Sequence, residues 1–147
     1  MWIDESGFAH GMPRTHGYAA KGERCFGTSN WGARGRTNVI GALLGGLLLT
    51  VGLFATTVNT IVFTHWLKQD LLKKLPKHCV IIMDNASFHK GEEMKKVILQ
   101  HGHILEYLPP YSPDLNPIEK KWAQTKKLRQ KQQCNVETLF KNNVAIL

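Results

Sequence analysis

Three acidic residues occupy positions where carboxylates can do chemistry. Asp84 directly follows the apolar run at 79–83, and the carboxyl end of a buried strand is where open α/β sheets place their ligands. Asp4 follows a shorter apolar stretch, and Glu119 lies in the first turn of a helix that Asn116 and Pro117 are expected to start. Carboxylates that converge from separate elements bind hard divalent cations, and two such ions promote phosphoryl transfer. The three acids therefore predict a metal-dependent phosphoryl-transfer site.

Each acid also has a purely structural interpretation when it is taken alone. Asp84 and Asn85 could start a turn, Asp4 could be a solvated terminal acid, and Glu119 suits any helix start because of the helix dipole. Glu5 could replace Asp4 as a ligand, but strand alternation points the two side chains to opposite faces. Only one of them can face the other acids, and the combination of three is more informative than any member.

The charge pattern indicates a polyanionic partner. The chain carries 19 Lys and Arg against 11 Asp and Glu, a net charge of +8, and segment 120–131 holds six basic residues and no acid. Basic residues beside a candidate metal ligand favour a phosphate backbone, although a solvated helix is the alternative. The candidate DNA-binding residues are Lys120, Lys126, Lys127, Arg129 and Lys131, together with Arg34 and Arg36.

Two further polar residues follow Asp84. Asn85 is adjacent to it and His89 lies five residues beyond it. Either side chain could offset the desolvation of the Asp84 carboxylate, and His89 could position a phosphate or a water. Both are therefore auxiliary candidates.

Length and composition set the domain class. The chain has 147 residues, of which 43% are hydrophobic and 20% charged, which is typical of one globular domain and unlike disordered, collagen-like or disulfide-dense chains. Its three cysteines show no zinc spacing. We therefore expect a single domain over 1–147 in a reduced, cytoplasmic protein.

One segment permits a membrane interpretation. Residues 39–63 contain no charged side chain and are long enough to span a bilayer as a helix. However, Gly45 and Gly46 form a hairpin signal between two apolar stretches, and the basic flanks show no clear sidedness. Two buried strands are the favoured interpretation.

The remaining pattern alternates strands with helices. Strands are expected at 1–8, 37–44, 47–54, 79–83 and 104–108, with short strands possible near Tyr18 and at 24–26. Helices are expected at 59–75, 90–100, from 116 to about 131, and at 136–147. This order predicts an α/β domain with a mixed sheet flanked by helices.

These motifs together resemble the catalytic domain of DDE transposases, in the bacterial insertion-sequence branch of the mariner-type superfamily. The resemblance rests on DESGF at 4–8, WGARGRTNVIGAL at 31–43, DNASFHK at 84–90 and LPPYSPDLNPIEKKW at 108–122. The tract YSPDLNPIE is the most specific part. The 34 residues between Asp84 and Glu119 are the spacing that this branch uses for its second and third acids.

The resemblance implies an RNase H-like fold with Asp4, Asp84 and Glu119 as catalytic and metal-binding residues. It implies two Mg²⁺ ions, with Mn²⁺ as an alternative, cleavage of DNA strands at transposon ends and strand transfer into target DNA. It also implies a homodimer on DNA. Family members carry an amino-terminal helix-turn-helix domain that recognises the transposon ends and precedes the catalytic domain. Here only three residues precede Asp4, so we expect that domain to be absent from this chain and supplied by an upstream half. The alternative is a catalytically silent remnant that binds DNA or modulates a full-length transposase.

Overall fold

The computed structural model describes residues 1–10, 35–144 and 146–147. The expected short strands near Tyr18 and at 24–26, and the candidate Arg34, lie outside these residues. Five strands form one sheet: β1 (Trp2–Ala9), β2 (Arg36–Leu44), β3 (Leu47–Phe54), β4 (Val80–Met83) and β5 (Ile104–Tyr107). All five match strands expected from the sequence.

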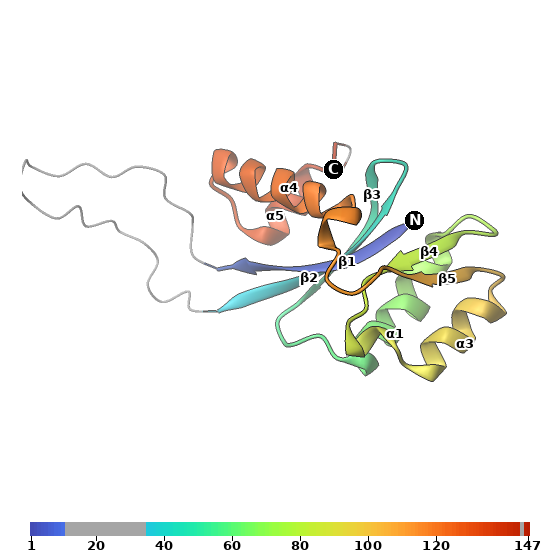
Figure 1. The fold of residues 1–147 in the computed structure, drawn as a ribbon. Coiled ribbons are helices and arrows are strands. Elements are labelled where there is room, and N and C mark those ends of the chain that lie inside the picture. Colours follow the sequence, from blue (N-terminus) through green and yellow to red (C-terminus); the bar gives the residue numbers. More distant parts are fainter. Residues whose placement is uncertain (11–34, 145) are drawn as a thin grey trace, which may run out of the picture.

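The sheet is mixed, with the strand order β3-β2-β1-β4-β5. Strands β1, β2 and β3 are antiparallel neighbours, whereas β4 runs parallel to both β1 and β5. Strand β1 therefore lies at the centre, between the antiparallel hairpin and the parallel pair (Figure 1).

The uncharged segment at 39–63 contains a hairpin, so the membrane interpretation was wrong. Gly45 and Gly46 have φ angles of 59° and 84°, a conformation that glycine adopts without the steric cost of a side chain. They connect β2 to β3, and the rest of the segment leads into a helix. No helix in the described part of the chain is long and apolar enough to cross a membrane.

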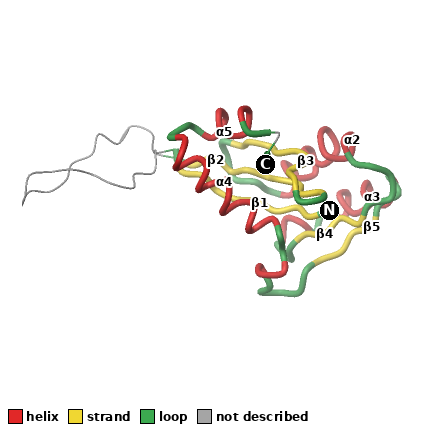
Figure 2. Tube along the Cα trace, turned by 90° about the horizontal axis from the view of Figure 1, so that it is seen from above, coloured by secondary structure: helices red, strands yellow, loops and turns green. Residues whose placement is uncertain are grey.

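Helices cover both faces of the sheet (Figure 1). On one face lie α1 (Thr60–Trp66), its continuation to Lys74 and α3 (Glu92–Gln100); on the other lie α4 (Ile118–Gln132) and α5 (Val136–Asn142). Figure 2 shows α4 running along β1 and β2. Each face has its own apolar cluster, one built around Phe63 and Ile81 and the other around Phe8 and Trp122.

The expected helix at 59–75 is present but interrupted. Asn59 caps its start by accepting a hydrogen bond from the Val62 amide, and a π-helical turn at Leu67–Leu71 precedes α2 (Leu72–Lys74). Leu67 and Leu71, at the two ends of this turn, are both fully buried. The last helix ends at Asn142, earlier than expected.

The pairing of β1 with β4 matters most for the candidate site. Ile3 is in register with Met83 in the parallel pair, so Asp4 and Asp84 follow at equivalent positions on neighbouring strands, which are about 4.8 Å apart in any sheet. Two aspartates that are distant in the sequence thereby reach the same level of the sheet.

Candidate active site

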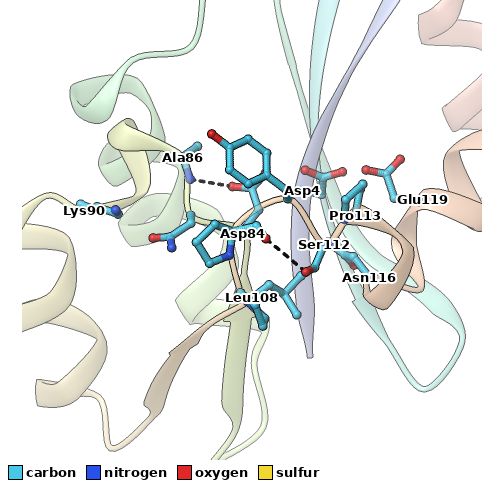
Figure 3. Close-up of a pocket in the computed structure, with 13 residues that line it drawn as sticks. Asp4, Asp84, Ala86, Lys90, Leu108, Ser112, Pro113, Asn116 and Glu119 are labelled. Atoms are coloured by element: carbon cyan, nitrogen blue, oxygen red, sulfur yellow. Dashed lines mark hydrogen bonds between the residues drawn. The ribbon is translucent and has the colours of Figure 1, made fainter.

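A pocket of about 490 Å³ joins the three predicted acids. Asp4 comes from β1, Asp84 follows β4, and Glu119 lies in the first turn of α4. Figure 3 shows the side chains of Asp4 and Glu119 facing one another, with Asp84 farther across the pocket. The loop at 108–113 supplies much of the remaining wall.

Asp4 is buried, with 6% of its surface exposed. Trp122 Nε1 donates a hydrogen bond of 3.2 Å to Asp4 Oδ2. The indole reaches this carboxylate by lying over Gly41, the residue paired with Asp4 across β1 and β2, where a Cβ would stand 2.5 Å from Trp122 Cη2. Burial, reinforced by the negative charge of Glu119, raises the pKa of Asp4 to about 8.

Asp84 has different surroundings, with 47% of its side chain exposed. His89 Nδ1 lies 2.7 Å from Asp84 Oδ1, and the Ala86 amide donates to the same oxygen at 3.1 Å. The hydrogen bond from His89 is the main reason that the pKa of Asp84 is lowered, and it outweighs partial burial. Asp84 is therefore held as a carboxylate.

His89 is fully buried and contacts two acids. Its Nε2 lies 2.9 Å from Glu5 Oε1, on the face of β1 opposite the side chain of Asp4, as strand alternation predicted. Burial disfavours the imidazolium, but the hydrogen bonds and charges of Asp84 and Glu5 outweigh it and raise the pKa of His89 to about 9. The predicted auxiliary His89 thus contacts Asp84, while Asn85 lines the pocket.

Glu119 is exposed at the start of α4. Asn116, which is 3% exposed, accepts a hydrogen bond from the Ile118 amide through Oδ1 and from the Glu119 amide through its backbone oxygen. These bonds fix the first turn of α4 and direct Glu119 toward the pocket.

The donor set of the pocket fits a hard divalent cation. All three side chains offer carboxylate oxygens, the ligands that Mg²⁺ prefers. Burial, and then the negative charge of Glu119, raises the pKa of Asp4, so a cation bound there would favour its ionised form. Within residues 1–10, 35–144 and 146–147, no three His, Cys, Asp or Glu side chains stand close enough to hold one ion together. The acids thus border one pocket as a spread group.

The basic segment at 120–131 forms most of α4. Lys120, Lys127 and Lys131 are exposed at spacings that share one side of the helix. Lys126 lies 5.3 Å from the ring centre of Phe8 and lines a second pocket of about 510 Å³ with Gly7, Phe8 and Ala9. Its distance along α4 from Glu119 is about two helical turns.

Arg129 does not belong to this surface, contrary to the sequence-based expectation. It is 5% exposed, and its Nε and Nη1 donate to the backbone oxygens of Cys134 and Ala9. Its guanidinium therefore connects α4 to the end of β1 instead of facing solvent. Arg36 is exposed at the start of β2 and covers Gly7 of the neighbouring strand.

Sequence reasoning missed two residues that support the site, one in contact with Asp4 and the other in contact with His89. Trp122 packs in the core, and its role as a donor to Asp4 depends on its approach over Gly41. Glu5 was considered only as a replacement ligand, yet it contacts His89. The signal for Glu5 was its place in an apolar strand, on the face opposite Asp4, where a carboxylate needs a buried cationic or donor partner.

Comparison with known proteins supports this arrangement of the fold. The family model described as DDE superfamily endonuclease matches residues 1–139. The crystal structure of a pre-cleavage Mos1 transpososome aligns with a TM-score of 0.72 at 19% identity, covering 99% of this chain and 48% of that chain. The crystal structure of the Mos1 strand transfer complex aligns with a TM-score of 0.68 at 18% identity, covering 86% and 40%.

The catalytic domain alone gives the same result. The crystal structure of the catalytic domain of Mos1 mariner transposase aligns with a TM-score of 0.64 at 17% identity, covering 77% of this chain and 63% of that chain. Among curated proteins, the uncharacterized protein y4pE/y4sA of Sinorhizobium fredii is 40% identical over 45 residues, 31% of each chain. The chain thus spans less than half the length of the Mos1 chains in the two complexes and about a third of the curated relative.

These structural matches confirm the predicted RNase H-like fold, a mixed five-stranded sheet flanked by helices. The family match covers β1, α4 and every element between them, which includes all three acids of the pocket. The chain belongs to the DDE superfamily endonuclease family.

Proposed function

We propose that this chain is the catalytic domain of a transposase and that it cleaves DNA strands and transfers them with divalent metal ions. The observation that carries the proposal is the pocket in which Asp4, Asp84 and Glu119 meet from three separate elements. The similar structures include a Mos1 transpososome and a Mos1 strand transfer complex, and these make DNA the favoured substrate.

In this proposal, Asp4, Asp84 and Glu119 hold two Mg²⁺ or Mn²⁺ ions. Such ions activate an attacking oxygen and stabilise the leaving oxygen of a phosphodiester. The protein's own contribution is to fix the carboxylates: Trp122 holds Asp4, and the capped first turn of α4 directs Glu119. A structure of Mos1 catalytic domain with Mg and raltegravir gives a precedent for the metal in a protein of this fold.

The exposed lysines of α4 supply the DNA surface of the proposal. The ion pairs of the described residues leave Lys120, Lys126, Lys127 and Lys131 without a carboxylate partner. Unpaired lysines along a helix whose first turn holds Glu119 suit a phosphate backbone entering the acidic pocket. Arg36, exposed at the start of β2, is a further candidate.

The larger assembly also belongs to the proposal. We assign residues 1–147 to one catalytic domain of the bacterial insertion-sequence branch, and we expect a homodimer on DNA with helix-turn-helix segments that read the transposon ends. Light scattering with and without a DNA duplex tests the dimer. A complex of one protein chain per duplex would contradict it.

The direct test is metal-dependent nicking of a labelled DNA duplex. The parent is compared with Glu119→Gln and with Glu137→Gln, a matched change at an exposed glutamate of α5. We expect nicking by the parent and the Glu137 variant in Mg²⁺ or Mn²⁺, and none by the Glu119 variant or in EDTA. A folded parent that never nicks, or a Glu119 variant that nicks at the parental rate, would contradict the proposal.

A further inference from the structure

The two oxygens of Asp84 have unequal surroundings. Oδ1 lies 2.7 Å from His89 Nδ1 and accepts a hydrogen bond of 3.1 Å from the Ala86 amide. These two donors saturate one side of the carboxylate. Since 47% of the side chain is exposed and Asp84 lines the acidic pocket, Oδ2 is the oxygen left to act as a ligand there.

The donor that orients Asp84 is itself fixed at its far side. His89 Nε2 lies 2.9 Å from Glu5 Oε1, and the two residues are 84 positions apart in the sequence. Carboxylate oxygens only accept hydrogen bonds, so both ring nitrogens must donate. The ring cannot rotate without losing one of its two carboxylate partners.

Three aromatic residues hold His89 in place, two at its ring and one at its backbone. The rings of Phe63 and Phe88 lie 4.7 Å and 4.3 Å from the imidazole centre. The Tyr107 hydroxyl donates a hydrogen bond to the backbone oxygen of His89. His89 is fully buried by these contacts, so its position is set by packing as well as by charge.

We propose that His89, anchored by Glu5, is a positioning residue that turns the free oxygen of Asp84 toward a divalent cation in the acidic pocket. The inference rests on the proposed function and adds Glu5 to the residues on which the metal site depends. It also replaces the expectation that His89 positions a phosphate or a water, because both ring nitrogens are already engaged.

Two substitutions at one position separate orientation from packing. In His89→Asn the amide nitrogen falls near the place of Nδ1, so the hydrogen bond to Asp84 is retained while the one to Glu5 is removed. In His89→Gln the amide nitrogen falls near the place of Nε2, so the hydrogen bond to Glu5 is retained and the one to Asp84 is removed. Both take the imidazole out of the same aromatic cage.

The readout is the dissociation constant for Mn²⁺, measured by electron paramagnetic resonance of the free ion, with thermal unfolding recorded for every variant. Losing an outer partner of a metal ligand weakens metal binding roughly 10- to 100-fold. We expect that loss for His89→Gln and a smaller loss for His89→Asn. His65→Gln and His65→Asn, on the exposed side of α1, serve as matched controls without effect.

The outcomes separate this inference from the function on which it rests. Asp84→Ala is measured alongside; if it binds Mn²⁺ as the parent does, the proposed metal site fails and the inference with it. If Asp84→Ala loses Mn²⁺ binding but both His89 variants keep it, or lose it equally, the positioning role alone is overturned. Retention by His89→Asn above His89→Gln supports it.

Glu5 keeps the inference testable if the His89 variants do not fold. Its side chain is 23% exposed, so Glu5→Ala leaves a smaller defect in the core. We expect Glu5→Ala to fold and to weaken Mn²⁺ binding several-fold, and Glu137→Ala on α5 to have no effect on Mn²⁺ binding. Parental Mn²⁺ affinity in a folded Glu5→Ala variant would overturn the role of the anchor.

Discussion

Asp4 and Asp84 lie on neighbouring parallel strands, one residue beyond the registered pair Ile3 and Met83. Asp4 is buried and receives a neutral indole N–H, and its pKa is raised to about 8. Asp84 is half-exposed and is paired with His89 Nδ1, and its pKa is lowered. Two aspartates at the same level of the sheet therefore have pKa values shifted in opposite directions.

This contrast suggests a division of tasks between the two carboxylates. Asp84 is ionised and oriented before any cation arrives, because its positive partner is part of the fold. Asp4 is destabilised as a carboxylate, and a cation that binds there relieves a cost already present in the fold. In the proposed metal site, one aspartate would be preorganised for the cation and the other would gain most from it.

Removing either carboxylate should have the largest effect and should not distinguish the two. We expect Asp4→Asn and Asp84→Asn each to lower the rate of DNA nicking by about 10³-fold or more, since each loses several kcal/mol of charge stabilisation. Single-turnover nicking in Mn²⁺ measures this. A variant that retains a tenth of the parental rate would remove that residue from the site.

Stability without metal should separate the two aspartates. In EDTA at pH 7, Asp4→Asn should raise the Tm, because it removes a carboxylate that burial disfavours. Asp84→Asn should lower it by roughly 5 °C, because His89 then loses one of its two carboxylate partners. Thermal unfolding by circular dichroism measures both shifts, and shifts of the same sign would refute the contrast.

The pH dependence of stability should divide in the same way. The pKa of Asp4 rises from 3.8 to about 8 on folding, so its contribution is present below pH 3.8 and is lost as the pH rises toward 8. His89, whose pKa is raised from 6.5 to about 9, adds a loss between those values. Asp84 acts oppositely, because its lowered pKa stabilises the fold above pH 3.8 and that contribution is lost in acid.

In metal-free buffer we therefore expect the Tm to fall from pH 6.5 to pH 9. Asp4→Asn should reduce the fall in Tm up to about pH 8, and His89→Gln should reduce the fall between pH 6.5 and about pH 9. Thermal unfolding over pH 5–9 in EDTA tests this. A parental Tm that rises across that interval would contradict both assignments.

The donor to Asp4 should matter less than the carboxylate itself. Trp122→Phe keeps a ring over Gly41 but removes the indole N–H, and we expect about a tenfold slower nicking rate and a stability loss of about 1 kcal/mol. Trp66→Phe is the matched control, since Trp66 is buried and its Nε1 has no hydrogen-bond partner within the described residues. Equal effects of the two changes would show that packing alone is involved.

The lysines of α4 should give the smallest single effects. We expect Lys127→Ala or Lys131→Ala to weaken DNA binding modestly and to reduce the slope of log K against log salt by about 1 for each phosphate that is no longer neutralised. Lys77→Ala, exposed before β4, is the control. Salt titrations of fluorescence anisotropy measure the slopes, and an unchanged slope would place the DNA elsewhere.

The parts of this site that follow local rules were predictable from sequence. Asp84 after an apolar strand, the hairpin turn at Gly45 and Gly46, and the opposite faces of Asp4 and Glu5 all depend on neighbouring residues alone. The contact of Glu5 with His89 was not predictable, because it requires the parallel pairing of β1 with β4. That pairing joins segments far apart in the chain.

Two other differences also have tertiary causes. Arg129 was expected on the DNA surface because its charge alone suggested it, but its place on the inner side of α4 is set by packing against β1. The π-helical turn at Leu67–Leu71 was not predictable, because the apolar spacing of this segment fits an ordinary α-helix.

The proposed function requires that Asp4 and Asp84 hold divalent cations together despite their opposite surroundings. The most direct measurement is the shift in Tm on adding Mn²⁺ to the parent, Asp4→Asn and Asp84→Asn at pH 7. Ligand at a hundred times its Kd stabilises a fold by about 2.7 kcal/mol. We predict a shift of several degrees for the parent and none for either variant; equal shifts in all three proteins would contradict the account.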